Sequence, residues 1–157
     1  MFSSLFLSKN QKLVKKWKKE HEKIVLLTHQ VIAEYSKNNH KKAKKKLIAL
    51  NNLVIDHVTD ENIEFYKLLK DRKKFSSKNE KSIVEFVDTF KDTKMTLMQF
   101  LTKYTRASTV LDDDFFPTLN ELAEILVERI EFEEKNLYHL LDISKEEEKW
   151  EQIKRSL

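Results

Sequence analysis

Residues 50–65 read LNNLVIDHVTDENIEF, and this stretch contains the pattern that decides the fold. The inward face of a helix through it has four positions at intervals of three or four residues: Leu50, Val54, His57 and Glu61. That spacing is typical of one face of an α-helix. Two of the four positions are ionisable. The stretch therefore predicts a helix that turns a histidine and a glutamate, one turn apart, into an apolar core.

The same spacing extends outward along most of the chain. The predicted helices cover residues 11–37, 41–70, 77–104 and 115–140. Ser77 and Glu80 are spaced as a capping box, and Pro117 falls in the first turn of the last long helix, where proline is tolerated. Ser144 and Glu147 repeat the capping-box spacing, which predicts a short fifth helix.

The composition agrees with an all-helical protein. The 157 residues include no glycine, one proline and no cysteine. Folds that need glycine at positive φ, such as Rossmann folds and P-loops, are excluded, and so are disulfides and thiolate zinc sites. The length corresponds to one domain over residues 1–157. Because the connections are short, we expect an all-α, up-down-up-down four-helix bundle with a short extra C-terminal helix.

Polar residues interrupt the apolar seams near the midpoint of each helix, and these midpoints share one level in an antiparallel bundle. The predicted buried polar layer consists of His21, His57, Glu61, Thr93, Arg129 and Glu133. Burying two carboxylates and two imidazoles costs several kcal/mol unless the groups are paired or bind a metal.

Two explanations of this layer are open. In one it holds a metal, since a histidine and a glutamate one turn apart, with a carboxylate from a second helix, bind iron in helical bundles. In the other, the Arg129 guanidinium pairs with Glu61 and Glu133 and replaces the metal. We favour this metal-free layer, because a fixed positive charge repels a cation. A plainer alternative is that Arg129 extends to solvent and the histidines are ordinary core residues.

The remaining features point to a soluble regulator rather than an enzyme. The sequence has no glycine elbow, phosphate loop or nucleophile–base signature. Residues 1–75 contain 18 Lys and Arg against 8 Asp and Glu, which we interpret as a solvated lysine surface rather than a nucleic-acid site. No stretch approaches the ~20 apolar residues of a membrane span, and residues 1–7 lack the features of a signal peptide. We expect a cytoplasmic protein with no membrane partner.

Three segments resemble the hemerythrin-like cation-binding (HHE) domain: Glu20-His21, His57-Val-Thr-Asp-Glu61 and Arg129-Ile-Glu-Phe-Glu133-Glu-Lys-Asn-Leu-Tyr138. That family carries His-x-x-x-Glu and His-x-x-x-Glu-Glu-x-x-Leu-Tyr patterns around a di-iron site. The resemblance implies four metal ligands: His21, His57, Glu61 and Glu133. Arg129 and Thr93 stand where that family has histidine. In this alternative the chain binds iron as a di-iron site and acts as an oxygen or redox sensor or as a metal-binding protein.

A second similarity extends over nearly the whole chain, to the regulator of sigma D (Rsd/AlgQ) family of anti-sigma factors. The matching segments are Lys12–Trp17, Asp56–Tyr66, Phe100–Tyr104 and Leu126–Lys135. That family also has arginine at the position of Arg129, and the resemblance implies that Asp56, Thr59 and Ile63 face a sigma factor. We therefore predict a non-catalytic regulator of transcription that binds a protein partner, with the metal-binding domain as the alternative.

Overall fold

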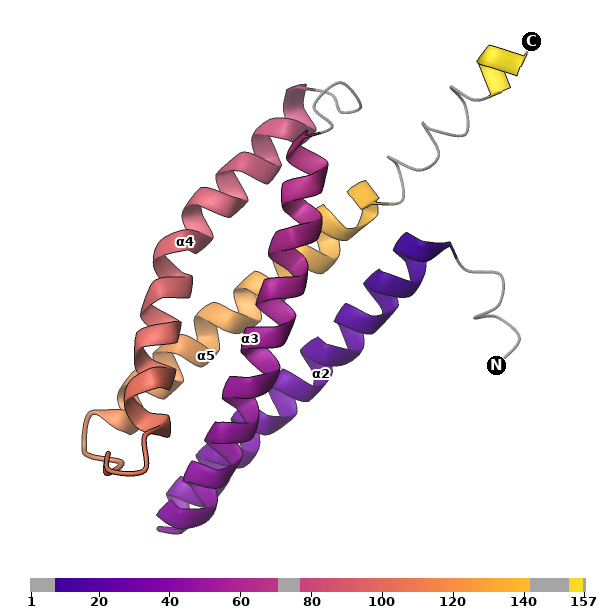
Figure 1. Ribbon diagram of the computed structural model, residues 1–157. Coiled ribbons are helices and arrows are strands. Elements are labelled where there is room, and N and C mark those ends of the chain that lie inside the picture. The colour runs from indigo at the N-terminus through magenta and orange to yellow at the C-terminus, as the bar shows by residue number, and fades with distance from the viewer. Residues whose placement is uncertain (1–7, 71–76, 142–152, 157) are drawn as a thin grey trace.

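The computed structural model describes residues 8–70, 77–141 and 153–156. They form an antiparallel bundle of four long helices that run alternately down and up (Figure 1). The helices are α2 (Lys9–Ser36), α3 (His40–Lys70), α4 (Ser77–Thr105) and α5 (Phe115–Phe132), and the last continues through a π-helix, η2 (Glu133–Leu137), into residues 138–141. The predicted all-α bundle is confirmed. Residues 142–152, which include the start of the predicted fifth helix at Ser144, lie outside the described residues.

Helix α2 begins earlier than the sequence analysis predicts, because its first turn has a capping box. The Ser8 hydroxyl accepts a hydrogen bond from the Gln11 backbone N–H at 3.1 Å, and the Gln11 side chain accepts one from the Ser8 N–H at 2.9 Å. These two bonds satisfy donors that a helix start leaves unpaired. Helix α4 begins at Ser77 as predicted, and Pro117 lies in the first turn of α5.

The tight turn between α2 and α3 depends on an asparagine. Asn38 adopts a φ of 61°, in the left-handed region. Glycine usually fills such positions, and asparagine is among the residues that tolerate them best. The turn closes through backbone bonds from Asn38 to Tyr35 and from Asn39 to Glu34, both 2.9 Å. A chain without glycine thereby reverses direction within three residues.

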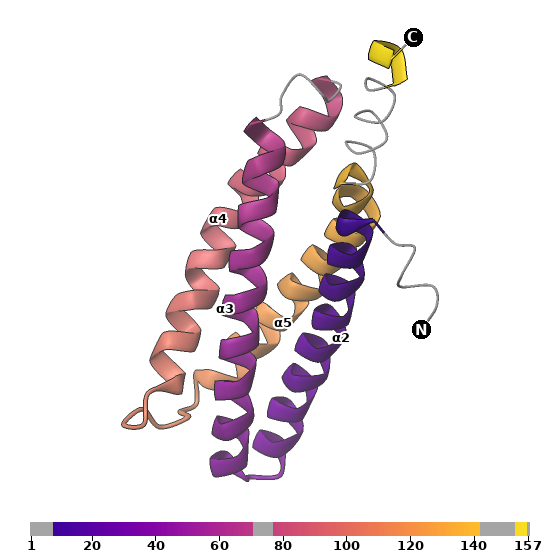
Figure 2. The ribbon, with the colours of Figure 1, turned by 45° about the vertical axis from the view of Figure 1, so that its right-hand side comes forward.

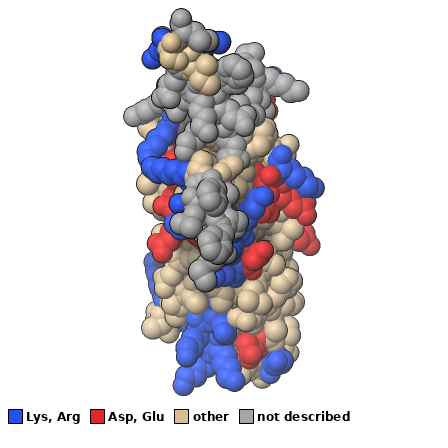
Figure 3. Space-filling view, turned by 90° about the vertical axis from the view of Figure 1, so that its right-hand side faces the viewer, with Lys and Arg blue, Asp and Glu red and all other residues tan. Residues whose placement is uncertain are grey.

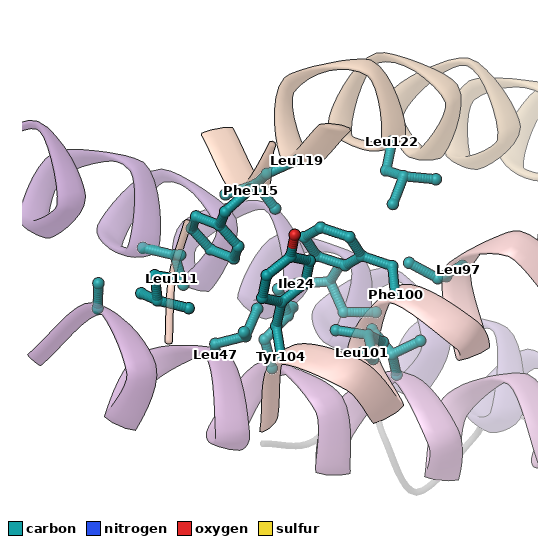
Figure 4. Packing of buried hydrophobic residues seen from close by; sticks show 14 of the residues in the cluster. Ile24, Leu47, Leu97, Phe100, Leu101, Tyr104, Leu111, Phe115, Leu119 and Leu122 are labelled. Carbon is teal, nitrogen blue, oxygen red and sulfur yellow. The ribbon is translucent and has the colours of Figure 1, made fainter. Parts of the chain in front are cut away.

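The core has two apolar clusters, one toward each end of the bundle. The larger contains Ile24, Leu47 and a group of aromatic rings, among which Phe100, Tyr104 and Phe115 meet in Figure 4. The smaller cluster contains Trp17, Phe65, Ile83, Leu137, Tyr138, Leu140 and Leu141. On α2, Trp17 belongs to one cluster and Ile24 to the other. His21 therefore lies at the boundary between them.

Helix α5 crosses the bundle obliquely and diverges from α4 (Figures 1 and 2). The end of α4 and the start of α5 lie close together on either side of the 106–114 link, and the two helices separate with distance from it. A cavity of about 650 Å³ lies between them, with Phe86, Phe90 and Thr93 on the α4 side and Ile125 and Arg129 among the residues on the α5 side. The side chains of the polar layer consequently come mainly from α2, α3 and the last helix, which is α5 with its continuation η2.

Lysines dominate the surface at the end of the molecule where α2 turns into α3 (Figure 3). Lys37, Lys41, Lys42 and Lys45 are all exposed there. Farther along α2 the positive charge is partly matched, since Lys16 forms an ion pair with Asp60 at 2.7 Å. Within the described ranges, no helix has the length and hydropathy needed to cross a membrane.

Candidate metal centre

Four side chains from three segments of the bundle turn their donor atoms toward one point. His21 comes from α2, His57 and Glu61 from α3, and Glu133 from the start of η2. One ring nitrogen of each histidine and one oxygen of each carboxylate all lie within 4.8 Å of one another. The side chains are only 1–4 % exposed. The layer is thus a compact set of two nitrogens and two oxygens removed from water.

The donor atoms of these four side chains lie within contact distance of one another. The His21 Nε2 atom lies 2.9 Å from His57 Nε2, 3.1 Å from Glu133 Oε2 and 3.5 Å from Glu61 Oε1. His57 Nε2 also contacts the same Glu61 oxygen. Both imidazoles therefore turn the same ring atom inward, which is how histidines present themselves to a common ligand.

Tyr138, which the sequence analysis left without a role, completes the cluster. Its hydroxyl lies 3.1 Å from His21 Nε2, 3.2 Å from Glu133 Oε2 and 3.3 Å from Glu61 Oε1. The ring is buried beside Trp17 and stacks on His21. Five polar side chains thus meet at one level of the core.

The residues present fit a cation. Imidazole nitrogen and carboxylate oxygen are ligands for iron, manganese and zinc. Within the described part of the chain, the second oxygen of Glu61 is buried and accepts no hydrogen bond. Buried polar atoms are normally satisfied, and a cation bound at this carboxylate would satisfy the unpartnered oxygen. His21, His57, Glu61 and Glu133 are the side chains that could hold it.

The family model of the hemerythrin HHE cation-binding domain matches residues 12–141. The chain belongs to this family. No curated protein and no solved structure matches the chain. Membership of the HHE family and the buried cluster together favour a metal-binding site over the metal-free layer that the sequence analysis preferred. The similarity to anti-sigma factors is not among the relationships that these comparisons show.

Two further carboxylates lie behind the histidines of this HHE domain. Glu20 Oε2 is 3.4 Å from His57 Nδ1, and Glu134 Oε1 is 3.9 Å from His21 Nδ1. These are ion-pair distances, and within the described part of the chain neither Nδ1 atom makes a hydrogen bond. Sequence reasoning assigned the two carboxylates no role, although each directly adjoins a predicted layer residue.

Arg129 lies at the edge of the cluster with its side chain 8 % exposed, so the alternative in which it extends to solvent is wrong. Its Nε is 2.5 Å from Glu133 Oε1, and its guanidinium lies over the rings of Phe86 and Phe90. The predicted pairing with Glu133 is therefore present, whereas Glu61 is paired by the two histidines. The positive charge of Arg129 therefore compensates Oε1 of Glu133 and not Oε2, which faces the histidines.

Burial and the neighbouring charges shift the ionisation of the cluster strongly. Burial would raise the pKa of Glu61, but hydrogen bonds from His21 and His57 outweigh it and lower the pKa to about 2. Burial raises the pKa of Glu133 above its usual range. Burial alone would lower the pKa of His21, but the hydrogen bonds to Glu133 and Glu61 raise it to about 9. Without a metal, His21 is therefore protonated at neutral pH and a metal must displace that proton.

Thr93 does not join the layer, contrary to the sequence analysis. It is half-buried and lines the cavity between α4 and α5 together with Phe86 and Arg129. Helix α4 diverges from α5, so its midpoint stays away from the donors of the other helices. Asp56, Thr59 and Ile63, which the anti-sigma resemblance implies as contact residues, are exposed on the outer face of α3.

Proposed function

We propose that this HHE domain binds one metal cation through His21, His57, Glu61 and Glu133, and that it is a metal-binding or redox-sensing protein without catalytic activity. The single observation that carries the proposal is the convergence of four buried donor atoms within 4.8 Å of one another. Such a group costs several kcal/mol to bury unless it is compensated. One cation would compensate all four donors at once.

We infer that the cation is iron and that each chain binds one ion. Histidine and carboxylate side chains projecting from bundle helices are the donor set that holds iron in such folds. A second ion is disfavoured by Arg129, since its Nε occupies Glu133 Oε1 at 2.5 Å and its charge would repel another cation nearby. The expected stoichiometry is therefore one, and not the two of a di-iron site.

The residues around the cation would each have a defined task. When bound, iron supplies a one-electron redox centre and a Lewis acid. Glu20 and Glu134 would add negative charge behind the two imidazoles. Arg129 fixes the free oxygen of Glu133. The four donor side chains are 1–4 % exposed, so an organic substrate does not reach them, which favours ion binding or sensing over turnover.

Metal content after anaerobic loading with iron(II) and gel filtration tests this proposal. Untagged protein should retain about one iron per chain by elemental analysis. Glu61→Gln, which keeps the shape of the side chain, should lose most of that iron while its circular dichroism stays helical. His29→Ala and His139→Ala are matched controls, because both histidines are exposed, and they should keep the iron. Absence of iron from the native chain, or equal retention by Glu61→Gln, would overturn the proposal.

We propose, as a second function, that the outer face of α3 binds a protein partner. Three isoleucines on this face are 40–50 % exposed: Ile48, Ile55 and Ile63. Ile55 and Ile63 lie on either side of Asp56 and Thr59 along the helix, and the three isoleucines are spaced seven and eight residues apart, as in helices that dock on other helices. The identity of the partner, an RNA polymerase sigma factor, rests on the resemblance in the sequence alone.

Binding to a purified sigma factor, measured by calorimetry, tests this second function. Ile63→Glu should abolish the interaction, because it places a charge in the apolar face. Leu26→Glu changes an equally exposed apolar residue on α2 and should leave the interaction intact. If sigma factor does not bind, or if both variants behave alike, this face has no such role.

A further inference from the structure

Tyr138 lies in the cluster because the last helix contains a π turn directly before it. Helix α5 changes to a π-helix over Glu133–Leu137 and returns to α-helical geometry at Tyr138. The backbone N–H of Tyr138 donates to the carbonyl of Glu133, five residues earlier, which is the bond that defines a π turn. Single π turns inside α-helices occur frequently at functional sites.

The π turn decides where the Tyr138 side chain lies. In a regular α-helix, residues five apart are separated by roughly 140° around the axis and do not share a face. The wider π turn reduces that angle. As a result, Glu133 and Tyr138 both enter the core, and the Tyr138 hydroxyl reaches Glu133 Oε2 at 3.2 Å.

The hydroxyl lies close to more polar atoms than its single proton can serve. It lies within 3.1–3.3 Å of a ring nitrogen of His21 and of carboxylate oxygens of Glu61 and Glu133. A phenol has one proton to donate. Its oxygen is thus held among three of the four converging donor atoms, in a residue 2 % exposed. A cation that binds those atoms would lie within reach of the phenol oxygen as well.

We propose that Tyr138 is a fifth ligand, whose phenolate oxygen binds the same cation as His21, His57, Glu61 and Glu133. The proposal rests on the proposed metal site. As the metal–oxygen bond forms, the phenol O–H bond breaks and its proton passes to solvent, so no oxidant or reductant is needed. The η2 turn is then the structural element that supplies the ligand.

Loading with iron(III) from its citrate complex tests this assignment, because phenolate bound to iron(III) is coloured. The native protein should show a visible charge-transfer band, and resonance Raman spectra excited in that band should contain tyrosinate ring modes. Tyr138→Phe keeps the ring in place and should lose the band while its iron affinity falls at least about tenfold. Tyr104→Phe is the matched control, since Tyr104 is also buried but bonds Asp112, and it should keep the band.

The outcomes separate this inference from the proposed function. If the native protein retains iron but shows no tyrosinate modes, the ligand assignment is wrong and the metal site stands. If Tyr138→Phe keeps the band, another group produces it and the assignment is wrong. If the native protein retains no iron, both proposals fail. The Raman spectrum of the native protein decides the matter even if Tyr138→Phe does not fold.

Discussion

At the residue scale, Arg129 shows how a protein can keep a permanent positive charge next to a cation site. The guanidinium is held between the Glu133 carboxylate and two phenylalanine rings, and its pKa, lowered by burial to about 10, leaves it charged at neutral pH. It neutralises Glu133 on the side away from the histidines. On the proposed function, this charge would limit the site to one ion, while the inner oxygen of Glu133 would remain available to it.

Replacing Arg129 by leucine should destabilise the metal-free protein by about 3 kcal/mol, because it leaves Oε1 of the buried Glu133 carboxylate without its charged partner. Urea unfolding in the presence of a chelator measures the change. Arg106→Leu removes an exposed arginine in the link after α4 and should have little effect. An Arg129→Leu variant as stable as the native chain would show that the pair does not contribute.

The raised pKa of His21 predicts how stability depends on pH. The pKa of His21 is about 9 in the folded, metal-free protein and 6.5 when unperturbed, so its contribution is complete below pH 6.5 and disappears as pH rises through 9. We expect the difference in unfolding free energy between the native chain and His21→Gln to shrink across that range. Metal affinity should change in the opposite direction, because the ligand must lose its proton. A difference that stays constant with pH would contradict this assignment.

At the scale of elements, the turn between α2 and α3 is the place where the lack of glycine has a measurable consequence. Asn38→Gly should preserve or slightly increase stability, because glycine adopts the observed positive φ without steric cost. Asn38→Ala should reduce stability by about 1 kcal/mol, since alanine tolerates that conformation poorly. Thermal unfolding of the two variants distinguishes them. Equal melting temperatures would mean that the backbone at this position is not constrained as described.

The sequence predicted the elements well where a regular period applies and poorly where it does not. The three-and-four spacing placed His57 and Glu61 on the inner face of α3, and the structure buries both. A regular helical period places Tyr138 and Glu133 on different faces. The π turn that brings Tyr138 into the cluster could therefore not be predicted from the spacing. The capping box at Ser8 was not predicted, although serine followed three residues later by glutamine is its signature.

At the scale of the whole molecule, the inclination of the helices decides which of them contributes to the site. Thr93 was predicted in the layer on the assumption that all four helix midpoints meet. Helix α5 instead crosses obliquely and diverges from α4 (Figure 2). Thr93 therefore lines the cavity between these two helices. Crossing angles depend on side-chain packing between helices that are distant in sequence, and periodicity within one helix does not contain that information.

Metal binding should stabilise the entire bundle, because the donors come from α2, α3 and the end of the last helix. A ligand that binds only the folded state adds about 2.7 kcal/mol at one hundred times its dissociation constant. We expect iron(II) to raise the melting temperature of the native chain under anaerobic conditions and to leave Glu61→Gln unchanged. An equal rise in both proteins would indicate binding elsewhere on the surface.

We propose that the buried layer holds a single cation. Anomalous diffraction from crystals of the iron-loaded protein, recorded at the iron absorption edge, would locate that ion. We expect one anomalous peak per chain, enclosed by His21, His57, Glu61 and Glu133. Two peaks in the layer, a peak only at the surface, or a core without anomalous density would contradict it.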